Sequence, residues 1–260
     1  MKISGLQKVS LVDYDGQIAT TIFTSGCNFA CPFCHNSGLV KGTEPEIPTS
    51  EILEYLNKRK NVLTAVCISG GEPTLHKDLP EFISKIKELG YLVKLDTNGT
   101  NLPMLKFLVE NKLIDYVAMD IKNSFENYAR TIGTETKIDI KETIDYLMSC
   151  GINYEFRTTL IKNYHTTNDI TNIAQTISGA NKYFLQKFVD NDNCLMQGLE
   201  EIDYNTATEF LNICLKHIPN TKLRGYWQKA LVLCHRQLII LQLIGINNEI
   251  TKEIIYKKLP

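Results

Sequence analysis

The sequence lacks an excess of charge of either sign, because 28 Lys and Arg residues stand against 29 Asp and Glu residues in a chain of 260. It also lacks a basic stripe and any patch in which basic and aromatic side chains alternate. A surface that binds nucleic acid needs clustered positive charge, so we expect no nucleic-acid partner. The length predicts one domain of α/β-barrel size or two small domains, with a core that needs no disulfides.

Two kinds of apolar segment are also missing. Residues 1–5 (MKISG) contain no apolar core of a secretory signal. The longest apolar stretch, 231–246, is interrupted by His235, Arg236 and Gln237, and it is too short and too charged to cross a membrane. We therefore expect a cytoplasmic protein without membrane contact, in which disulfides are disfavoured.

Eight cysteines are present, and Cys27, Cys31 and Cys34 have the spacing C-x3-C-x2-C. Three thiolates this close together need a cation to neutralise them, and an iron–sulfur cluster is such a cation. Clusters are normally held by four cysteines, and no fourth lies nearby in the sequence. The missing ligand would leave one iron open, and an open position is typical of a catalytic rather than a structural metal.

Other interpretations of the cysteines are a zinc site completed by His35, a set of disulfides, or unrelated core thiols. Structural zinc sites favour paired spacings, which makes zinc the weaker interpretation. A hypothesis without catalysis also remains, in which the protein is an electron-transfer or zinc-binding module and not an enzyme. The other five cysteines are scattered through apolar or helical segments and are expected to be small core residues: Cys67, Cys150, Cys194, Cys214 and Cys234.

Apolar, β-branched segments alternate with amphipathic segments along most of the chain. Strands are predicted at 17–24, 62–68, 91–95, 116–119, 154–161 and 182–189, with a short seventh at 221–224. Helices are predicted at 49–60, 78–89, 103–111, 137–150, 167–177 and 205–216. The alternation indicates parallel strands joined by right-handed crossovers, and hence an α/β fold, a partial (β/α)6 TIM-like barrel. Residues 1–224 are expected to form this barrel domain, and residues 225–260 a helical C-terminal tail packed on it.

Polar clusters follow several of the predicted strands. Beside the cysteine loop these are Gly70-Gly71-Glu72, Asp96-Thr97-Asn98 and Asp120-Ile121-Lys122. Each by itself is equally explained by a tight turn or a simple ion pair. Arg157 lies in an otherwise apolar strand and needs an anionic partner if it is buried. Functional groups of barrel folds gather at the carboxyl ends of the strands, so the clusters together predict one functional site.

Histidines carry a weaker signal. His35 directly follows Cys34, where it either orients a bound cofactor or forms a hydrogen bond with the loop backbone. The remaining four histidines show no ligand spacing and are given no role: His76, His165, His217 and His235.

These motifs resemble the radical S-adenosylmethionine (SAM) superfamily. The cysteine spacing with an aromatic at Phe33 is similar to the superfamily's cluster motif, and residues 70–73 (GGEP) are similar to its strand-two motif. Residues 34–36 (CHN), with the motifs at 96–99 and 120–122, resemble glycyl-radical-enzyme activases. Residues 10–16 (SLVDYDG) and 154–159 (YEFRTT) are most like anaerobic ribonucleoside-triphosphate reductase activating proteins. The resemblance covers roughly residues 1–225.

The resemblance implies a role for each site residue. Cys27, Cys31 and Cys34 would ligate a 4Fe–4S cluster, whose fourth iron would bind the amine and carboxylate of SAM. The residues that would contact SAM are Phe33, His35, Gly70, Gly71, Glu72, Asp96, Asn98, Lys122 and Arg157. Within this set, Phe33 would lie by the adenine and residues 70–72 would receive the methionine amine. Asp96, Lys122 and Arg157 would hold the ribose or carboxylate region. A monovalent cation would be held by Asp96, Thr97 and Asp120, although Ala118 stands where some activases have Met.

The resemblance also implies the reaction and its partners. One electron from flavodoxin or ferredoxin would reach the cluster, SAM would be cleaved to methionine and a 5′-deoxyadenosyl radical, and that radical would take a hydrogen atom from a glycine. The glycine would belong to a glycyl radical enzyme, with anaerobic ribonucleotide reductase the expected partner. The alternative within the superfamily is a small-molecule reaction, such as that of 7-carboxy-7-deazaguanine synthase.

Overall fold

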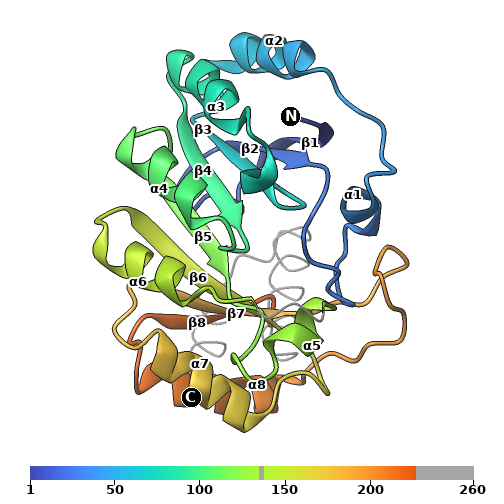
Figure 1. The fold of residues 1–260 in the computed structure, drawn as a ribbon, viewed down its shortest axis with the longest axis vertical. Helices are drawn as coiled ribbons and strands as arrows, with labels where there is room; N and C mark the ends of the chain where they lie inside the picture. Colours follow the sequence, from blue (N-terminus) through green and yellow to red (C-terminus); the bar gives the residue numbers. More distant parts are fainter. Residues whose placement is uncertain (135–137, 227–260) are drawn as a thin grey trace, which may run out of the picture. The chain divides into compact units, whose positions relative to one another are not determined.

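The computed structural model describes residues 1–134 and 138–226, and eight strands of this part form one sheet in chain order (Figure 1). Every pair from β2 to β8 is parallel, whereas β1 runs antiparallel to β2. The strands are β1 Ile3–Ser10, β2 Ala19–Thr24, β3 Ala65–Gly70, β4 Leu92–Thr97, β5 Tyr116–Asp120, β6 Asn153–Leu160, β7 Tyr183–Lys187 and β8 Thr221–Arg224. Within the described residues β1 and β8 are the two edges of the sheet, so the barrel is not closed, and the predicted partial barrel with parallel strands is confirmed.

Helices connect the parallel strands, and α3, α4, α6 and α7 lie on the same side of the sheet (Figure 1). The helices are α1 Ser37–Lys41, α2 Thr49–Arg59, α3 Leu79–Glu88, α4 Leu102–Glu110, α5 Tyr128–Ile132, α6 Lys141–Ser149, α7 Thr167–Thr176 and α8 Tyr204–Leu215, with a 3₁₀ turn at Pro73–Leu75. Five of the six predicted helices agree within two residues at each end. The one predicted at 137–150 begins at Lys141 instead, where the Asp139 side chain accepts a hydrogen bond from the Lys141 amide. The two one-turn helices, α1 and α5, are too short to show a periodic pattern.

The core lies between the sheet and these helices. The first four residues of both β3 and β5 are buried, as expected for strands covered on both faces. Helix α3 buries Ile83 and Ile86 completely on its apolar face. Each such side chain contributes roughly 1.5–3 kcal/mol through removal of apolar surface from water. This packing fixes the strands whose carboxyl ends carry the polar motifs.

The antiparallel strand β1 was not predicted from the sequence. It is an edge strand with exposed Gln7, Lys8 and Val9, so it has neither a continuous apolar run nor clear alternation. Its register pairs Leu6 with Ile22. By covering one side of β2, it turns the strand that leads into the cysteine loop into an interior strand.

Two predictions concern the end of the chain. The predicted helical tail at 225–260 falls almost wholly outside the described residues, so it and the domain boundary stay predictions. Among the described helices, none is long and apolar enough to cross a membrane.

A candidate cofactor site at the carboxyl ends of the strands

One cavity lies where β2 to β6 end. Of the residues predicted from the sequence to form the site, all except Glu72 line it. The lining residues are Cys27, Phe29, Cys31, Phe33, Cys34, His35, Asn36, Val40, Ser69, Gly70, Gly71, Asp96, Thr97, Asn98, Asp120, Lys122, Arg157 and Thr159. Five segments separated by many residues thus meet at one place, because parallel strands present their carboxyl ends at the same edge.

The cysteine loop forms one wall of the cavity and is held by its backbone. The Cys34 amide donates to the Cys31 carbonyl at 3.0 Å, which closes a tight turn between two of the thiols. The Ala30 amide donates to the Ile132 carbonyl of α5 at 2.9 Å. Phe29, within the loop, is buried. The thiols are therefore carried by a loop that is anchored to a second element.

The surroundings of Cys27 and Cys31 favour the neutral form of these two thiols. Burial raises the pKa of Cys27, and it raises the pKa of Cys31 to about 12. A bound metal is what converts such buried thiols to thiolates. Among the residues with described positions, no three His, Cys, Asp or Glu side chains converge closely enough to hold one metal ion. Three cysteine thiols on one wall of the cavity are donors of the kind that an iron–sulfur cluster takes from a protein.

The turn after β3 packs tightly on the start of the cysteine loop. The Gly71 amide donates to the Thr24 carbonyl at 2.9 Å, and the Glu72 amide donates to the Gly26 carbonyl at 2.8 Å. A Cβ atom on Gly71 would lie 1.9 Å from the Gly26 oxygen. Gly70 adopts a φ of +118°, which L side chains rarely adopt. The close approach of two backbones therefore explains both glycines, and it also brings their backbones to the cavity.

Glu72 is fully buried and does not line the cavity. One carboxylate oxygen accepts hydrogen bonds from the Thr97 hydroxyl at 2.7 Å and from the Thr74 amide and hydroxyl at 3.1 and 2.5 Å. The other accepts the Asn98 amide at 2.6 Å. Burial raises the pKa of Glu72, although these hydrogen bonds oppose the rise. Glu72 thus ties the end of β3 to the end of β4, and its predicted contact with the methionine amine stays a prediction.

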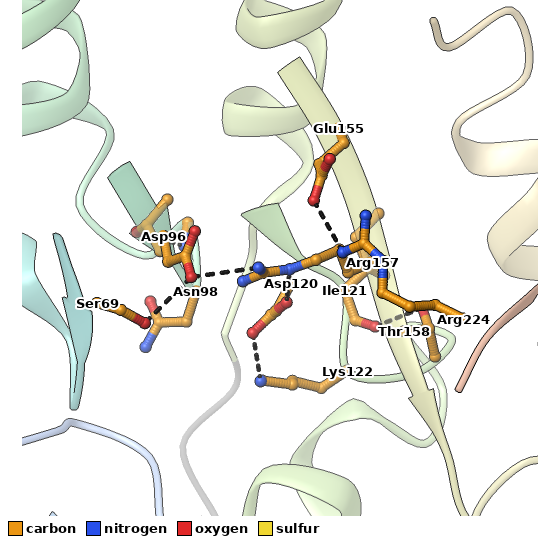
Figure 2. Close-up of polar contacts among 12 residues, drawn as sticks. Ser69, Asp96, Asn98, Asp120, Ile121, Lys122, Glu155, Arg157, Thr158 and Arg224 are labelled. Atoms are coloured by element: carbon orange, nitrogen blue, oxygen red, sulfur yellow. Dashed lines mark hydrogen bonds and ion pairs between the residues drawn. The ribbon is translucent and has the colours of Figure 1, made fainter. Parts of the chain in front are cut away.

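A cluster of four charged side chains forms another wall of the cavity. Figure 2 shows Arg157 between two carboxylates, with Nε 2.7 Å from Asp120 Oδ1 and Nη1 3.2 Å from Asp96 Oδ2. Lys122 Nζ lies 2.9 Å from Asp120 Oδ2, and the Ser69 hydroxyl donates to Asp96 Oδ2 at 3.1 Å (Figure 2). Arg157 therefore has the anionic partners that its place in an apolar strand requires.

The cations near Asp96 and Asp120 keep these two carboxyl groups ionised. Burial would raise the pKa of Asp120, but Arg157 and Lys122 outweigh burial and hold that pKa well below its usual range. Asp96 behaves in the same way, because Arg157 and Lys94 lower its pKa against the effect of burial. The cavity therefore presents ionised carboxylates next to fixed cations at neutral pH.

Two polar atoms at the cavity have no hydrogen-bond partner among the described residues. They are Oδ1 of Asp96, although Lys94 Nζ lies 3.5 Å away, and Nε2 of His35. The His35 ring stacks on Phe188 with 5.3 Å between ring centroids. Buried polar atoms are normally paired, so these two indicate that the cavity accommodates a polar ligand.

A deeper layer of charge was missed in the sequence. Lys94 donates to the Asp13 carbonyl at 2.5 Å and lies 3.8 Å from Glu155, which also accepts from the Tyr116 hydroxyl at 3.0 Å and from Arg224 at 3.3 Å. The signal was available. Lys94 stands two residues before Asp96 and Glu155 two before Arg157, so each pair shares one face of its strand. Ser69, Phe29, Asn36, Val40 and Thr159 are further lining residues that received no role from the sequence.

Comparison with known proteins identifies the family. The family model described as the Radical SAM superfamily matches residues 21–177, more than half of the chain, from β2 through α7. The chain belongs to this superfamily. It is therefore a radical SAM enzyme, and the resemblance read from its motifs is confirmed.

Two relatives come from Methanocaldococcus jannaschii, and both carry the name "Putative glycyl-radical enzyme activating enzyme". One is 35% identical over 85% of this chain and 95% of its own length, and the other is 30% identical over 77% and 78%. Among solved structures, Streptococcus suis SuiB bound to S-adenosylmethionine is similar with a TM-score of 0.63 and 15% identity. That similarity covers 78% of this chain but only 49% of SuiB, so it shows the shared fold alone.

The residues of the cavity fit the cofactors of the superfamily. Three thiols line one wall, which suits an iron–sulfur cluster. Another wall carries charged side chains, among them a carboxylate oxygen of Asp96 that accepts no hydrogen bond from the described residues, which suits a zwitterionic sulfonium ligand. The monovalent-cation site stays a prediction, because the guanidinium of Arg157 already lies between Asp96 and Asp120. The Thr97 hydroxyl is likewise engaged with Glu72.

Proposed function

We propose that this enzyme activates a glycyl radical enzyme by forming a radical on one of its glycines. The observation that carries the proposal is the 35% identity to a relative with an activating-enzyme name, of which the chain covers 95%. The match over nearly the whole relative supports a common activity and not only a common cofactor domain.

The lining of the cavity supports an assignment of residues to cofactors. Cys27, Cys31 and Cys34 would hold three irons of a 4Fe–4S cluster, and the open iron would bind the amine and carboxylate of SAM. A reduced cluster held by these cysteines would supply the electron for reductive cleavage of SAM, and the cleaved SAM would supply the group that abstracts hydrogen. The predicted SAM contacts of Phe33 and Asn98 belong to this proposal, since both residues line the cavity.

The protein's own side chains bind, orient and exclude water. Arg157 and Lys122 are cations held in place by Asp120, and they are available to the carboxylate and ribose of SAM. Phe29 and Phe33 are buried and make the cysteine wall apolar. No acid or base is needed, because the abstraction moves a hydrogen atom and not a proton.

Anaerobic ribonucleotide reductase is the proposed partner, with flavodoxin or ferredoxin as electron donor and the cytoplasm as location. Sequence motifs support this choice, especially residues 10–16 and 154–159. The open sheet, with β1 and β8 as edges of the described part, supports a macromolecular substrate, because a protein loop has a side from which to enter.

The test is anaerobic reconstitution with iron and sulfide, followed by dithionite and SAM. We expect release of 5′-deoxyadenosine, and we expect a glycyl doublet in the electron paramagnetic resonance spectrum when anaerobic ribonucleotide reductase is added. No 5′-deoxyadenosine would overturn the proposal as a whole. Turnover with a small molecule and no protein radical would favour the small-molecule alternative.

The cysteine assignment has its own control. Cys31→Ala is expected to lose the visible absorption of the cluster and nearly all 5′-deoxyadenosine release, whereas Cys150→Ala, at the end of α6, keeps both. Metal analysis that finds zinc and no iron in the wild-type protein would support the non-catalytic module instead.

A further inference from the structure

His165 is a buried histidine that the sequence gave no role, and its two ring nitrogens are both engaged. Nδ1 accepts a hydrogen bond from the Ile161 amide at 3.1 Å, so Nδ1 carries no proton. Nε2 lies 2.8 Å from the Lys122 carbonyl, which only accepts hydrogen bonds. The ring is therefore neutral, with its proton on Nε2, where it donates to Lys122. Burial lowers the pKa of His165, which agrees with the neutral form.

The residue that His165 holds reaches into the cavity. The Lys122 side chain ends 2.9 Å from Asp120. Burial would lower the pKa of Lys122, but Asp120 outweighs burial and raises it, so the side chain is an ammonium. The preceding carbonyl, of Ile121, accepts a hydrogen bond from the Thr158 hydroxyl at 2.7 Å (Figure 2). Two successive peptide groups after β5 are thus fixed to β6 and to the loop that follows it.

Further hydrogen bonds secure the same segment. Asn123 Nδ2 donates to the Tyr164 carbonyl at 2.8 Å. The Ser124 hydroxyl and the Asn127 side-chain Nδ2 donate to Asp169 Oδ1 at 2.6 and 2.7 Å. Asp169 is fully buried at the start of α7. The loop after β5 is therefore bound at several points to residues 161–169, and His165 is the member of this set that bonds to Lys122 itself.

The segment that carries Lys122 also supports the cysteine loop. It continues into α5, whose Ile132 carbonyl accepts the Ala30 amide at 2.9 Å. The Tyr128 ring of α5 meets Phe29 edge-on, with 6.3 Å between centroids. One continuous piece of chain therefore contacts the cysteine wall at one end and bears the ammonium of the charged wall at the other.

We propose that His165 is a positioning residue for the SAM site: its neutral Nε2–H holds the Lys122 backbone so that the ammonium faces the carboxylate of the bound ligand. The inference rests on the proposed function in one respect, that the cavity is where SAM binds. His165 does not line the cavity, so it acts on the site only through Lys122.

Two conservative variants separate the two hydrogen bonds. In His165→Gln the side-chain amide reaches the place of Nε2 and keeps the donor to Lys122, whereas in His165→Asn it reaches the place of Nδ1 and loses that donor. The loss of one such bond corresponds to roughly a five- to tenfold change in an equilibrium constant. We expect the Kd for SAM of the anaerobically reconstituted protein to rise by about fivefold in His165→Asn and by less than about twofold in His165→Gln. Iron content is expected to be unchanged in both, and His217→Asn, in the turn after α8, is the matched control.

A second measurement needs neither cluster nor SAM. Long-range ¹H–¹⁵N NMR spectra of the histidine-labelled apoprotein are expected to show His165 as the Nε2–H tautomer, with its signal identified by its absence in His165→Gln. An Nδ1–H tautomer, or equal losses of SAM affinity in the two variants, would overturn the inference. If wild-type protein binds SAM but activates no glycyl radical enzyme, the proposed function fails while the tautomer and the affinity series still decide the role of His165.

Discussion

Arg157 joins two carboxylates from different strands, and its side chain is only 11% exposed. Such a buried cation is tolerated because Asp120 and Asp96 offset the loss of hydration. Removing either carboxylate would leave Arg157 with only one of these two anionic partners. At the scale of single residues, the site is thus built from groups whose protonation and place are set by one another. This was foreseeable only in part, because the sequence shows that Arg157 needs an anion but not which one.

Asp169 gives a prediction about pH. Burial would raise its pKa, but hydrogen bonds from Ser124, Thr166 and Asn127 outweigh burial and lower the pKa from 3.8 to about 2. A carboxyl group with a lowered folded-state pKa stabilises the fold above its unfolded pKa, and this contribution is lost as pH falls through 3.8 toward 2. The contribution is about 2 kcal/mol. Asp169→Asn is therefore expected to lose about that much at pH 7, with the difference from wild type shrinking below about pH 4.

The measurement is the free energy of urea unfolding of the apoprotein by circular dichroism between pH 7 and pH 3. Using apoprotein removes any effect of acid on the cluster. Parallel curves for wild type and Asp169→Asn across this range would contradict the assignment.

At the scale of elements, the ends of β2 and β3 are joined more tightly than strand pairing alone requires. The backbone of Gly71 lies against that of Gly26, with no room for a Cβ atom between them. Glu72 then connects the same turn to the end of β4. The glycines and the acid of this motif have structural reasons to be present, in addition to the backbone surface that the glycines give to the cavity.

Gly71→Ala is expected to lower the free energy of unfolding by about 3 kcal/mol, because the added Cβ would force the two strand ends apart. Gly179→Ala is the matched control. It has a φ of +85° but nothing within 4 Å of a new Cβ, so only backbone strain of about 1 kcal/mol is expected. The two values come from urea unfolding at pH 7. If Gly71→Ala lowers the free energy of unfolding no more than Gly179→Ala does, the turn after β3 accommodates a Cβ atom and the prediction is wrong.

At the scale of the whole molecule, every residue of the described part that lines the cavity lies between Cys27 and Thr159. Strand β8 does not line the cavity but supports it, because Arg224 at its end lies 3.3 Å from Glu155 of the deeper charged layer. We therefore propose that residues 1–224 form the complete cofactor-binding domain.

A chain that ends at Tyr226 is expected to keep its iron content and to bind SAM within about twofold of the full chain. A chain that ends at Asn220 also lacks β8 and the Arg224–Glu155 pair, and it is expected to lose stability and cofactor together. Iron content and SAM affinity of the two truncated proteins are the measurements. Loss of the cluster in the longer one would place part of the site beyond residue 226.

The sequence by itself determined the cysteine spacing, the alternation of strands and helices, and the polar motifs at the strand ends. These signals are local, because ligand spacing, periodicity and turn chemistry can each be recognised within a segment of about twenty residues. They were enough to predict the open parallel barrel and most, but not all, of the residues that line the cavity. They were not enough for β1, whose polar edge-strand sequence has no strong period.

Only the tertiary structure decided how the predicted residues are used. It turned Glu72 away from the cavity, placed Lys94 and Glu155 in a buried layer, and gave His165 its contact with Lys122. The physical reason is distance along the chain. Arg157 and Asp96 are 61 residues apart and His165 and Lys122 are 43 apart, so their contacts arise only when neighbouring strands pair in register. A local sequence pattern can show that a polar residue stands at an unexpected position. Only the folded structure shows which residue it contacts there.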